Sequence, residues 1–193
     1  MLRALYDWTL SLAGHRHALW ALAIVSFVES SVFPIPPDIL MIPMIIAAPR
    51  KAWLIAGVCT ISSVLGGLLG YYIGYALFDV VGQPVLEAYG KMDLYNELKL
   101  TYDSDVGFWA VFVAGITPLP YKLFTILSGT LQFSVVPFVM ASIVARGLRF
   151  FIVAALLWKF GEPIRDFIEK RLGLMFILFV ALLIGGFLVL GAL

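Results

Sequence analysis

The chain has 193 residues, of which 62% are hydrophobic and 13% are charged, and its formal net charge is +1. Soluble domains have about 45–50% apolar and about 25% charged residues, so this composition excludes a soluble domain and indicates an integral membrane protein. The small net charge provides no basic surface for nucleic acid. The single cysteine, Cys59, excludes a disulfide framework and a thiolate metal cluster. We therefore treat residues 1–193 as one all-α membrane domain and expect no metal and no cofactor.

Residues 1–17 predict a short amphipathic helix that lies at the membrane interface. Tyr6 and Trp8 belong to its apolar side, and such side chains favour the level of the lipid headgroups. A basic interfacial turn explains His15 and His17 better than a metal site, because the chain has no further histidine.

Residues 18–48 form an apolar run that is broken near its middle at Pro34, Pro36 and Pro37. Prolines in this number cannot continue a helix. A straight crossing needs about 20 residues, so the run is too long for one crossing and each half is too short. We predict a re-entrant hairpin of two half-helices, with its tip near the middle of the membrane.

Two carboxylates, Glu29 and Asp38, flank this break and lie beside backbone carbonyls that no helix satisfies. Such backbone is tolerated at membrane depth only where protein buries it or where it lines a wet cavity. The break is therefore the first candidate site.

Residues 51–78 predict a full transmembrane helix. Gly66, Gly70 and Gly74 repeat at a spacing of four and form a face that lets another backbone approach closely. We expect this face to pack against a hairpin. Residues 79–106 are the most charged stretch and predict one polar helix at or outside the membrane interface, with a solvated charged face.

The second half repeats this order of elements. Residues 107–132 predict a second re-entrant hairpin, broken at Pro118 and Pro120. Full crossings follow at 136–160 and, after a polar connection over 161–171, at 172–193.

A shift of the sequence by 84 residues lays Pro34 on Pro118, Pro36 on Pro120 and Asp38 on Lys122. One crossing separates the two copies, so the hairpins would enter from opposite faces of the membrane. The predicted fold is an inverted repeat of two re-entrant hairpins, with three full transmembrane helices and amphipathic interfacial helices.

The distribution of lysine and arginine predicts the orientation, because these residues favour the cytoplasmic side. The same asymmetry results if each broken segment crosses once, so re-entrance depends on the length of the segments alone. With re-entrant hairpins the N-terminus is cytoplasmic. The residues on that side are Arg3, Arg16, Arg50, Lys51, Lys159, Arg165, Lys170 and Arg171, and those on the other side are Lys91 and Lys99.

Five ionisable residues lie inside apolar segments: Glu29, Asp38, Lys122, Arg146 and Arg149. Each costs roughly 2.5–3.5 kcal/mol at the bilayer centre, so they should face inward and pair. One hypothesis is a salt-bridge network that only holds the hairpins together. The other is a site for an anionic headgroup, in which the cations bind phosphate and the carboxylates accept protons.

At these residues the chain resembles the DedA family of membrane proteins, which contain the VTT domain. The matching residues are Phe27, Glu29, Ser30, Ser31, Phe33, Pro34, Pro36, Pro37, Asp38, Gly66, Gly70 and Tyr71, followed by Gly115, Pro118, Tyr121, Gly129, Arg146 and Arg149. Many members of the family have arginine at the positions of Gly115 and Tyr121. The chain is therefore similar to a divergent subgroup with Thr-Pro-x-Pro-Tyr-Lys in the second hairpin.

The resemblance implies a multi-pass protein of the bacterial inner membrane that moves lipids across the bilayer as a flippase or scramblase. The implied substrates are undecaprenyl phosphate or glycerophospholipids, with a dependence on proton motive force. Arg146, Arg149, Lys122 and Tyr121 are then the candidate phosphate-binding residues, and Glu29 and Asp38 the candidate proton-coupling residues.

Other functions are open to the same residues. A proton-coupled antiporter of small ions could use the same buried carboxylates. An intramembrane enzyme is not expected, because the apolar segments contain no nucleophile paired with a base and no set of metal ligands. The expected partners are membrane lipids and protons, and the sequence leaves a homo-oligomer open.

Overall fold

The computed structural model describes residues 17–32, 36–117, 119–161 and 163. These residues form helices joined by turns and contain no strand, as predicted for an all-α protein. The predicted helix at 1–17 (apart from His17), the final crossing at 172–193, and Pro34 and Pro118 lie outside the described residues.

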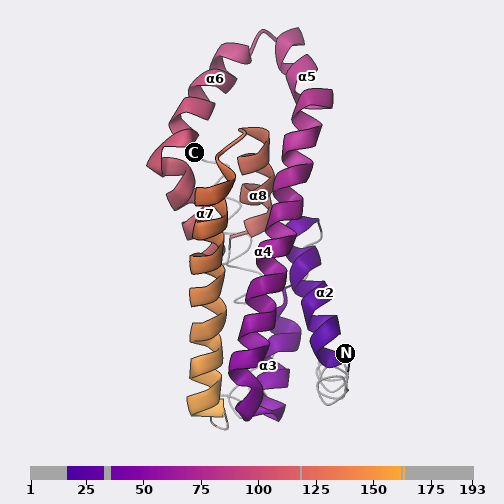
Figure 1. The fold of residues 1–193 in the computed structure, drawn as a ribbon, viewed down its shortest axis with the longest axis vertical. Helices are drawn as coiled ribbons and strands as arrows, with labels where there is room; N and C mark the ends of the chain where they lie inside the picture. The colour runs from indigo at the N-terminus through magenta and orange to yellow at the C-terminus, as the bar shows by residue number, and fades with distance from the viewer. Residues whose placement is uncertain (1–16, 33–35, 118, 162, 164–193) are drawn as a thin grey trace.

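The first broken segment contains two short helices, α2 (Ala18–Ser31) and α3 (Asp38–Ala47). Leu22, near the start of α2, packs in one apolar cluster with Ile45, near the end of α3, so the two helices run in opposite directions (Figure 1). The chain thus turns back at the break. Entry of this hairpin into a membrane remains a prediction.

The second broken segment has the same form. It contains α7 (Gly107–Ile116) and α8 (Tyr121–Thr130), and Pro120 directly precedes α8. A long helix, Val135–Gly161, follows and runs beside α4 to the lower end of the molecule (Figure 1).

The central element is α4 (Ala52–Leu77), which follows the short 3₁₀ turn η1 (Pro49–Lys51). Its glycine face contacts both hairpins. A Cβ atom on Gly66 would clash with the carbonyl of Phe27 in α2, and one on Gly74 would clash with the carbonyl of Ile126 in α8. The prediction that this face packs against a hairpin is confirmed, and it extends to both.

Residues 79–106 do not form the single helix that was predicted. After α4 the chain continues through a π-helical turn, η2 (Phe78–Gly82), into α5 (Gln83–Ala88), and then reverses at Gly90. Gly90 has φ of +62°, a conformation that glycine adopts without a steric penalty. A second helix, α6 (Met92–Thr101), descends from this turn into the π-helical η3 (Tyr102–Val106).

Two apolar clusters occupy opposite ends of α4. The first packs the open end of the α2–α3 hairpin against the first turns of α4, including Ala52 and Ile55. The second packs Leu131 and Phe133, at the open end of the α7–α8 hairpin, against Tyr71 and Phe78. The hairpins therefore approach from opposite ends of α4, and their breaks meet between the two clusters.

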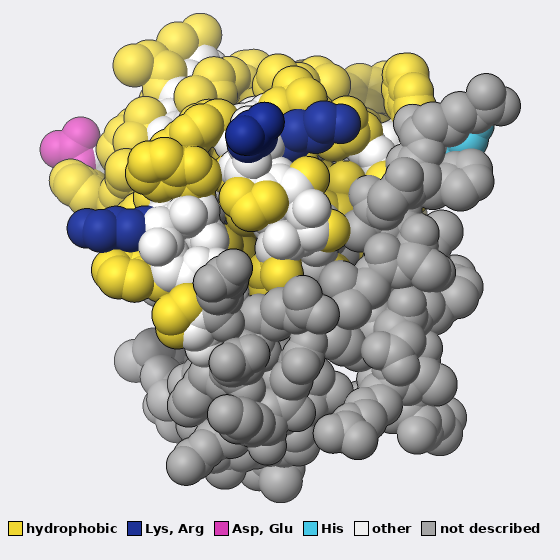
Figure 2. All heavy atoms as spheres, turned by 90° about the horizontal axis from the view of Figure 1, so that it is seen from below, with side chains coloured by type: hydrophobic (Ala, Val, Ile, Leu, Met, Phe, Trp, Pro, Cys, Tyr) yellow, Lys and Arg dark blue, Asp and Glu magenta, His cyan; other side chains and the backbone are white. Residues whose placement is uncertain are grey.

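Two of the described helical stretches, Pro49–Ala88 and Val135–Gly161, are long and apolar enough to cross a membrane. The lower end of the molecule in Figure 1 is shown from below in Figure 2, where lysine and arginine side chains lie among hydrophobic ones. Arg50, Lys51 and Lys159 are the exposed basic residues of the elements that end there.

Candidate functional site

The middle of the molecule, between the two apolar clusters, is lined with buried polar side chains. Most are hydroxyls that join neighbouring helices. Ser26 of α2 donates to the carbonyl of Cys59 in α4 (2.9 Å), and one turn later the hydroxyls of Ser30 and Ser63 lie 2.7 Å apart. These bonds fix α2 against α4 at the level of Glu29, the residue that precedes Ser30. The buried polar residues of the described part of the chain are Ser26, Ser30, Ser31, Ser63, Thr125, Ser128, Ser142 and Arg146.

Among the described residues, Arg146 is the most deeply buried charged residue, with 1% of its side chain exposed. Its Nη2 donates to Oε2 of Glu29 (2.9 Å), and its Nε donates to Oγ of Ser63 (2.6 Å). The rings of Tyr121 and Phe150 lie 5.0 and 4.7 Å from the guanidinium carbon. The guanidinium therefore joins α2, α4 and α8 to its own helix through charge, hydrogen-bond and cation–π contacts.

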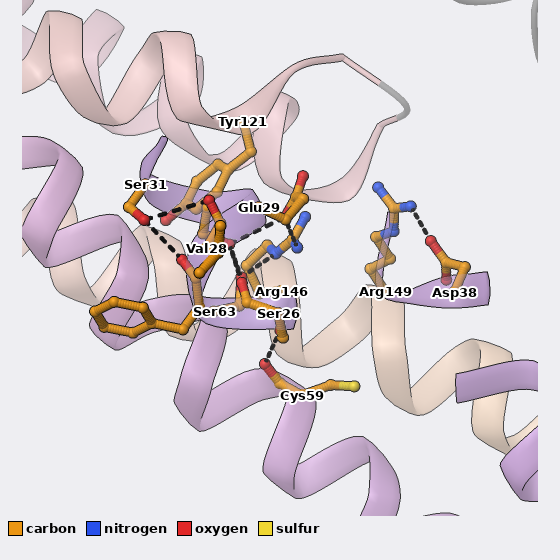
Figure 3. Close-up of polar contacts among 12 residues, drawn as sticks. Ser26, Val28, Glu29, Ser31, Asp38, Cys59, Ser63, Tyr121, Arg146 and Arg149 are labelled. Atoms are coloured by element: carbon orange, nitrogen blue, oxygen red, sulfur yellow. Dashed lines mark hydrogen bonds and ion pairs between the residues drawn. The ribbon is translucent and has the colours of Figure 1, made fainter. Parts of the chain in front are cut away.

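Arg149 lies one turn further along the same helix and forms the second ion pair. Its Nη2 donates to Oδ2 of Asp38 (2.7 Å), the first residue of α3, and its Nη1 donates to the carbonyl of Thr117 (3.1 Å). Both Arg149 and Asp38 are 23% exposed. Figure 3 shows this pair beside the Glu29–Arg146 group but separate from it.

Lys122 connects the two breaks directly. Its Nζ donates to the carbonyl of Val32 (3.2 Å), which is the C-cap of α2. Thr125, one turn later in α8, donates to the carbonyl of Ser30 (3.3 Å). Cations near the C-terminus of a helix interact favourably with its free carbonyls and its dipole. Two carbonyls at the end of α2, those of Ser30 and Val32, are thus bonded to side chains of the second hairpin.

The structure therefore brings together the five ionisable residues singled out in the sequence. Each carboxylate of the first hairpin pairs with one arginine of the Val135–Gly161 helix. Of the prolines, Pro36 and Pro37 precede α3 and Pro120 precedes α8.

Tyr121 is fully buried, and its hydroxyl donates to Ser142 (2.6 Å). Its hydroxyl is therefore already bonded within the protein, and its ring supports Arg146. Gly115, the other position at which the chain departs from the arginine pattern, is buried against the Val135–Gly161 helix. A Cβ atom there would clash with the Cβ atom of Ala145.

Two partners of the arginines were not found from the sequence. Ser63 is a hydroxyl residue on the small-residue face of α4, but its neighbour Ser62 is one as well, so the sequence does not show which of them bonds to an arginine. The partner at Thr117 is a backbone carbonyl, which any residue at the end of α7 would provide, so no residue type in the sequence indicates it.

The arrangement has three cations and two carboxylates, and thus a local excess of positive charge within the described residues. Within that part of the chain, Lys122 forms no ion pair. No group of three or more metal-ligating side chains occurs among the described residues. An anion is the ligand that this balance of charge favours.

Comparison with known proteins assigns the chain to a family. The VTT domain matches residues 35–159. The chain belongs to the VTT-domain (DedA) family. This VTT-domain family is membrane-associated.

An uncharacterised protein of Haemophilus influenzae is 38% identical over 169 residues, which cover 86% of this chain and 87% of the relative. A homologous uncharacterised protein of Histophilus somni is 40% identical with the same coverage. No solved structure matches this VTT-domain chain.

Proposed function

We propose that the protein is a lipid transporter, a flippase or scramblase that moves a phosphate-bearing lipid across the bacterial inner membrane. Undecaprenyl phosphate or a glycerophospholipid has the required chemistry. The observation that carries the proposal is the pair of ion pairs, Glu29–Arg146 and Asp38–Arg149, at the point where two broken helical segments meet.

The first support is the cost of burying charge. An internal ion pair can often be replaced by apolar residues without loss of stability, so holding the hairpins together is a weak reason to retain two of them. Arginine binds phosphate through two parallel hydrogen bonds, and a nearby lysine adds a point charge. The excess cation, Lys122, lies at the same breaks.

The second support is the arrangement of helices. A shift of 84 residues carries the bounds of α3 to within one residue of those of α8, and those of α4 to within one residue of the Val135–Gly161 helix. The hairpins also approach from opposite ends of α4. We interpret this as an inverted repeat with re-entrant hairpins, the architecture that places a transporter's site at the membrane midplane.

Glu29 and Asp38 are the proposed proton-coupling residues. Protonation of Asp38 would weaken its ion pair and free Arg149 for a phosphate, and protonation of Glu29 would weaken the ion pair that positions Arg146. This step would link transport to the proton gradient. Equal transport by Glu29→Gln and Asp38→Asn proteins at every pH would exclude proton coupling, but not lipid transport itself.

The test is translocation in reconstituted liposomes that carry a fluorescent phosphatidic acid in both leaflets. A membrane-impermeant quencher reports how fast the inner-leaflet lipid reaches the outside. We expect Arg149→Gln to slow translocation at least tenfold. Asp93→Asn is the control, because Asp93 is an exposed charge on α6 outside the site.

An antiporter of small ions makes the opposite prediction in the same liposomes. Proton-coupled ion flux without lipid translocation would overturn the lipid proposal and favour that alternative. Lipid translocation without ion flux would support the transporter.

A further inference from the structure

The two ion pairs differ in burial and in what they connect. Arg146 is enclosed, with 1% of its side chain exposed, and its partner Glu29 is 16% exposed. Arg149 and Asp38 are each 23% exposed. Displacing the enclosed pair would leave Arg146 without its partner in a setting where the aromatic rings of Tyr121 and Phe150 cannot replace a carboxylate.

Arg149 and Lys122 share a different feature, because each spans the two helix breaks. Arg149 contacts Asp38 on the first hairpin and the Thr117 carbonyl on the second. Lys122, on the second hairpin, contacts the Val32 carbonyl at the end of α2. These two cations, which we call the bridging cations, tie the tips of the hairpins together.

From this difference we propose that Arg149 and Lys122 exchange their present partners for a phosphate group. Arg146, in contrast, is a positioning residue that stays paired with Glu29. A phosphate group takes the place of the Asp38 carboxylate and of the Val32 and Thr117 carbonyls on the bridging cations. Its binding thereby releases the contacts that hold the hairpin tips together. The inference deepens the proposed function and rests on it for the lipid nature of the phosphate.

Two features of the structure carry this inference. The bonds of Lys122 to Val32 and of Arg149 to Thr117 are to neutral carbonyls, and a phosphate oxygen is a stronger acceptor for either cation. Both cations are accessible in part, unlike Arg146. A phosphate must break the contacts of the bridging cations in order to bind, so stronger contacts mean weaker phosphate binding. Phosphate binding and separation of the hairpin tips are therefore reciprocally coupled.

Two measurements test the inference on the whole protein in detergent. The first is the affinity for phosphatidic acid, with diacylglycerol as the lipid without phosphate and inorganic phosphate as the headgroup without a lipid. The second is the distance between spin labels at Ile39→Cys in α3 and Leu123→Cys in α8, in a Cys59→Ala background. Ile39 and Leu123 are 46% and 43% exposed, so both positions accept a label.

In the unaltered protein we expect phosphatidic acid to bind and to lengthen the distance between the labels, and diacylglycerol to do neither. Arg149→Gln and Lys122→Gln should each weaken binding at least tenfold and lengthen the distance without ligand. Lys122→Arg should retain binding. Binding of inorganic phosphate with the same affinity as phosphatidic acid would identify a free anion as the ligand and overturn the lipid part.

Arg146 is tested through its hydrogen-bond partner, because its own removal endangers folding. Ser63→Ala removes the bond to Nε and leaves the ion pair, and we expect the affinity for phosphatidic acid to change less than twofold. A tenfold loss in Ser63→Ala, equal to that of Arg149→Gln, would overturn the division between the cations.

The proposed function can fail separately. Phosphatidic acid translocation that is unaffected by Arg149→Gln and Lys122→Gln would overturn this inference alone. Absence of both binding and translocation in the unaltered protein would overturn the proposed function as well.

Discussion

The side chains of Ser30 and Ser63 meet at 2.7 Å where α2 crosses α4, and Ser63 also accepts the hydrogen bond from Nε of Arg146. A single pair of hydroxyls therefore joins the first hairpin, the central helix and the buried arginine. These hydrogen bonds require α2 and α4 to lie close together, and the glycines of α4 allow that close approach.

Gly66→Leu is expected to destabilise the protein by roughly 1–3 kcal/mol, the usual range for overpacking. Its Cβ atom would clash with the backbone of Phe27, which cannot move without shifting α2. The matched control is Gly57→Leu in the same helix, because a Cβ atom at Gly57 meets no atom within 4 Å. Unfolding in mixed detergent micelles measures both, and equal stability of the two variants would contradict the close packing.

Arg146→Met is expected to cost about 3–5 kcal/mol of folding free energy, because it leaves Glu29 as an unpaired charge. Adding Glu29→Gln should recover a large part of this loss. Lys159→Met is the control for removal of an exposed cation on the same helix and should change stability little. If the double variant is less stable than Arg146→Met alone, Glu29 contributes through contacts other than this ion pair.

Tyr71→Phe removes a buried hydroxyl that donates to the carbonyl of Phe133 at 2.6 Å. We expect a loss of about 1 kcal/mol, with the carbonyl left without this partner. The adjacent Tyr72→Phe makes the same chemical change at a side chain that is 66% exposed, and its stability should match that of the unaltered protein. The comparison reports on the attachment of the second hairpin to α4.

Topology can be tested with single cysteines in a Cys59→Ala background. Lys51→Cys lies at the basic lower end and Tyr89→Cys at the α5–α6 turn, and both native residues are exposed. A membrane-impermeant maleimide should label Tyr89→Cys in intact cells and Lys51→Cys only after permeabilisation. Labelling of both from one side would show that the Pro49–Ala88 helix does not cross the membrane.

Much of the helical order followed from local rules. Proline marks where α3 and α8 begin, and the apolar runs of α4 and Val135–Gly161 have the length of a crossing. The pairing of Glu29 and Asp38 with the two arginines was expected in kind, because charges in apolar segments must find partners.

The sequence did not show which carboxylate pairs with which arginine, because tertiary packing between distant segments determines that pairing. Arg146 and Arg149 have equal local signals, yet one is enclosed by Tyr121 and Phe150 and the other lies at a partly exposed break. The role of Tyr121 in substrate binding stays a prediction, and the hydrogen bond of its hydroxyl to Ser142 in the Val135–Gly161 helix was not foreseen from the sequence.

The polar stretch at 79–106 was the clearest difference between sequence and structure. Charged residues at Lys91 and Asp93 fit a single solvated helix as well as two. Gly90 is the residue that decides, because its positive φ reverses the chain between α5 and α6. One glycine among charges is a weak signal, and the sequence alone did not identify the turn.

The uninterrupted helical stretch Pro49–Ala88 has 40 residues. At 1.5 Å per residue it is about 60 Å long, twice the thickness of the hydrocarbon layer, which is about 30 Å. If its lower end starts at the cytoplasmic headgroups, α5 and the turn at Gly90 stand clear of the opposite membrane surface. They form an exposed helical epitope to which an antibody fragment could bind in order to add mass for electron microscopy.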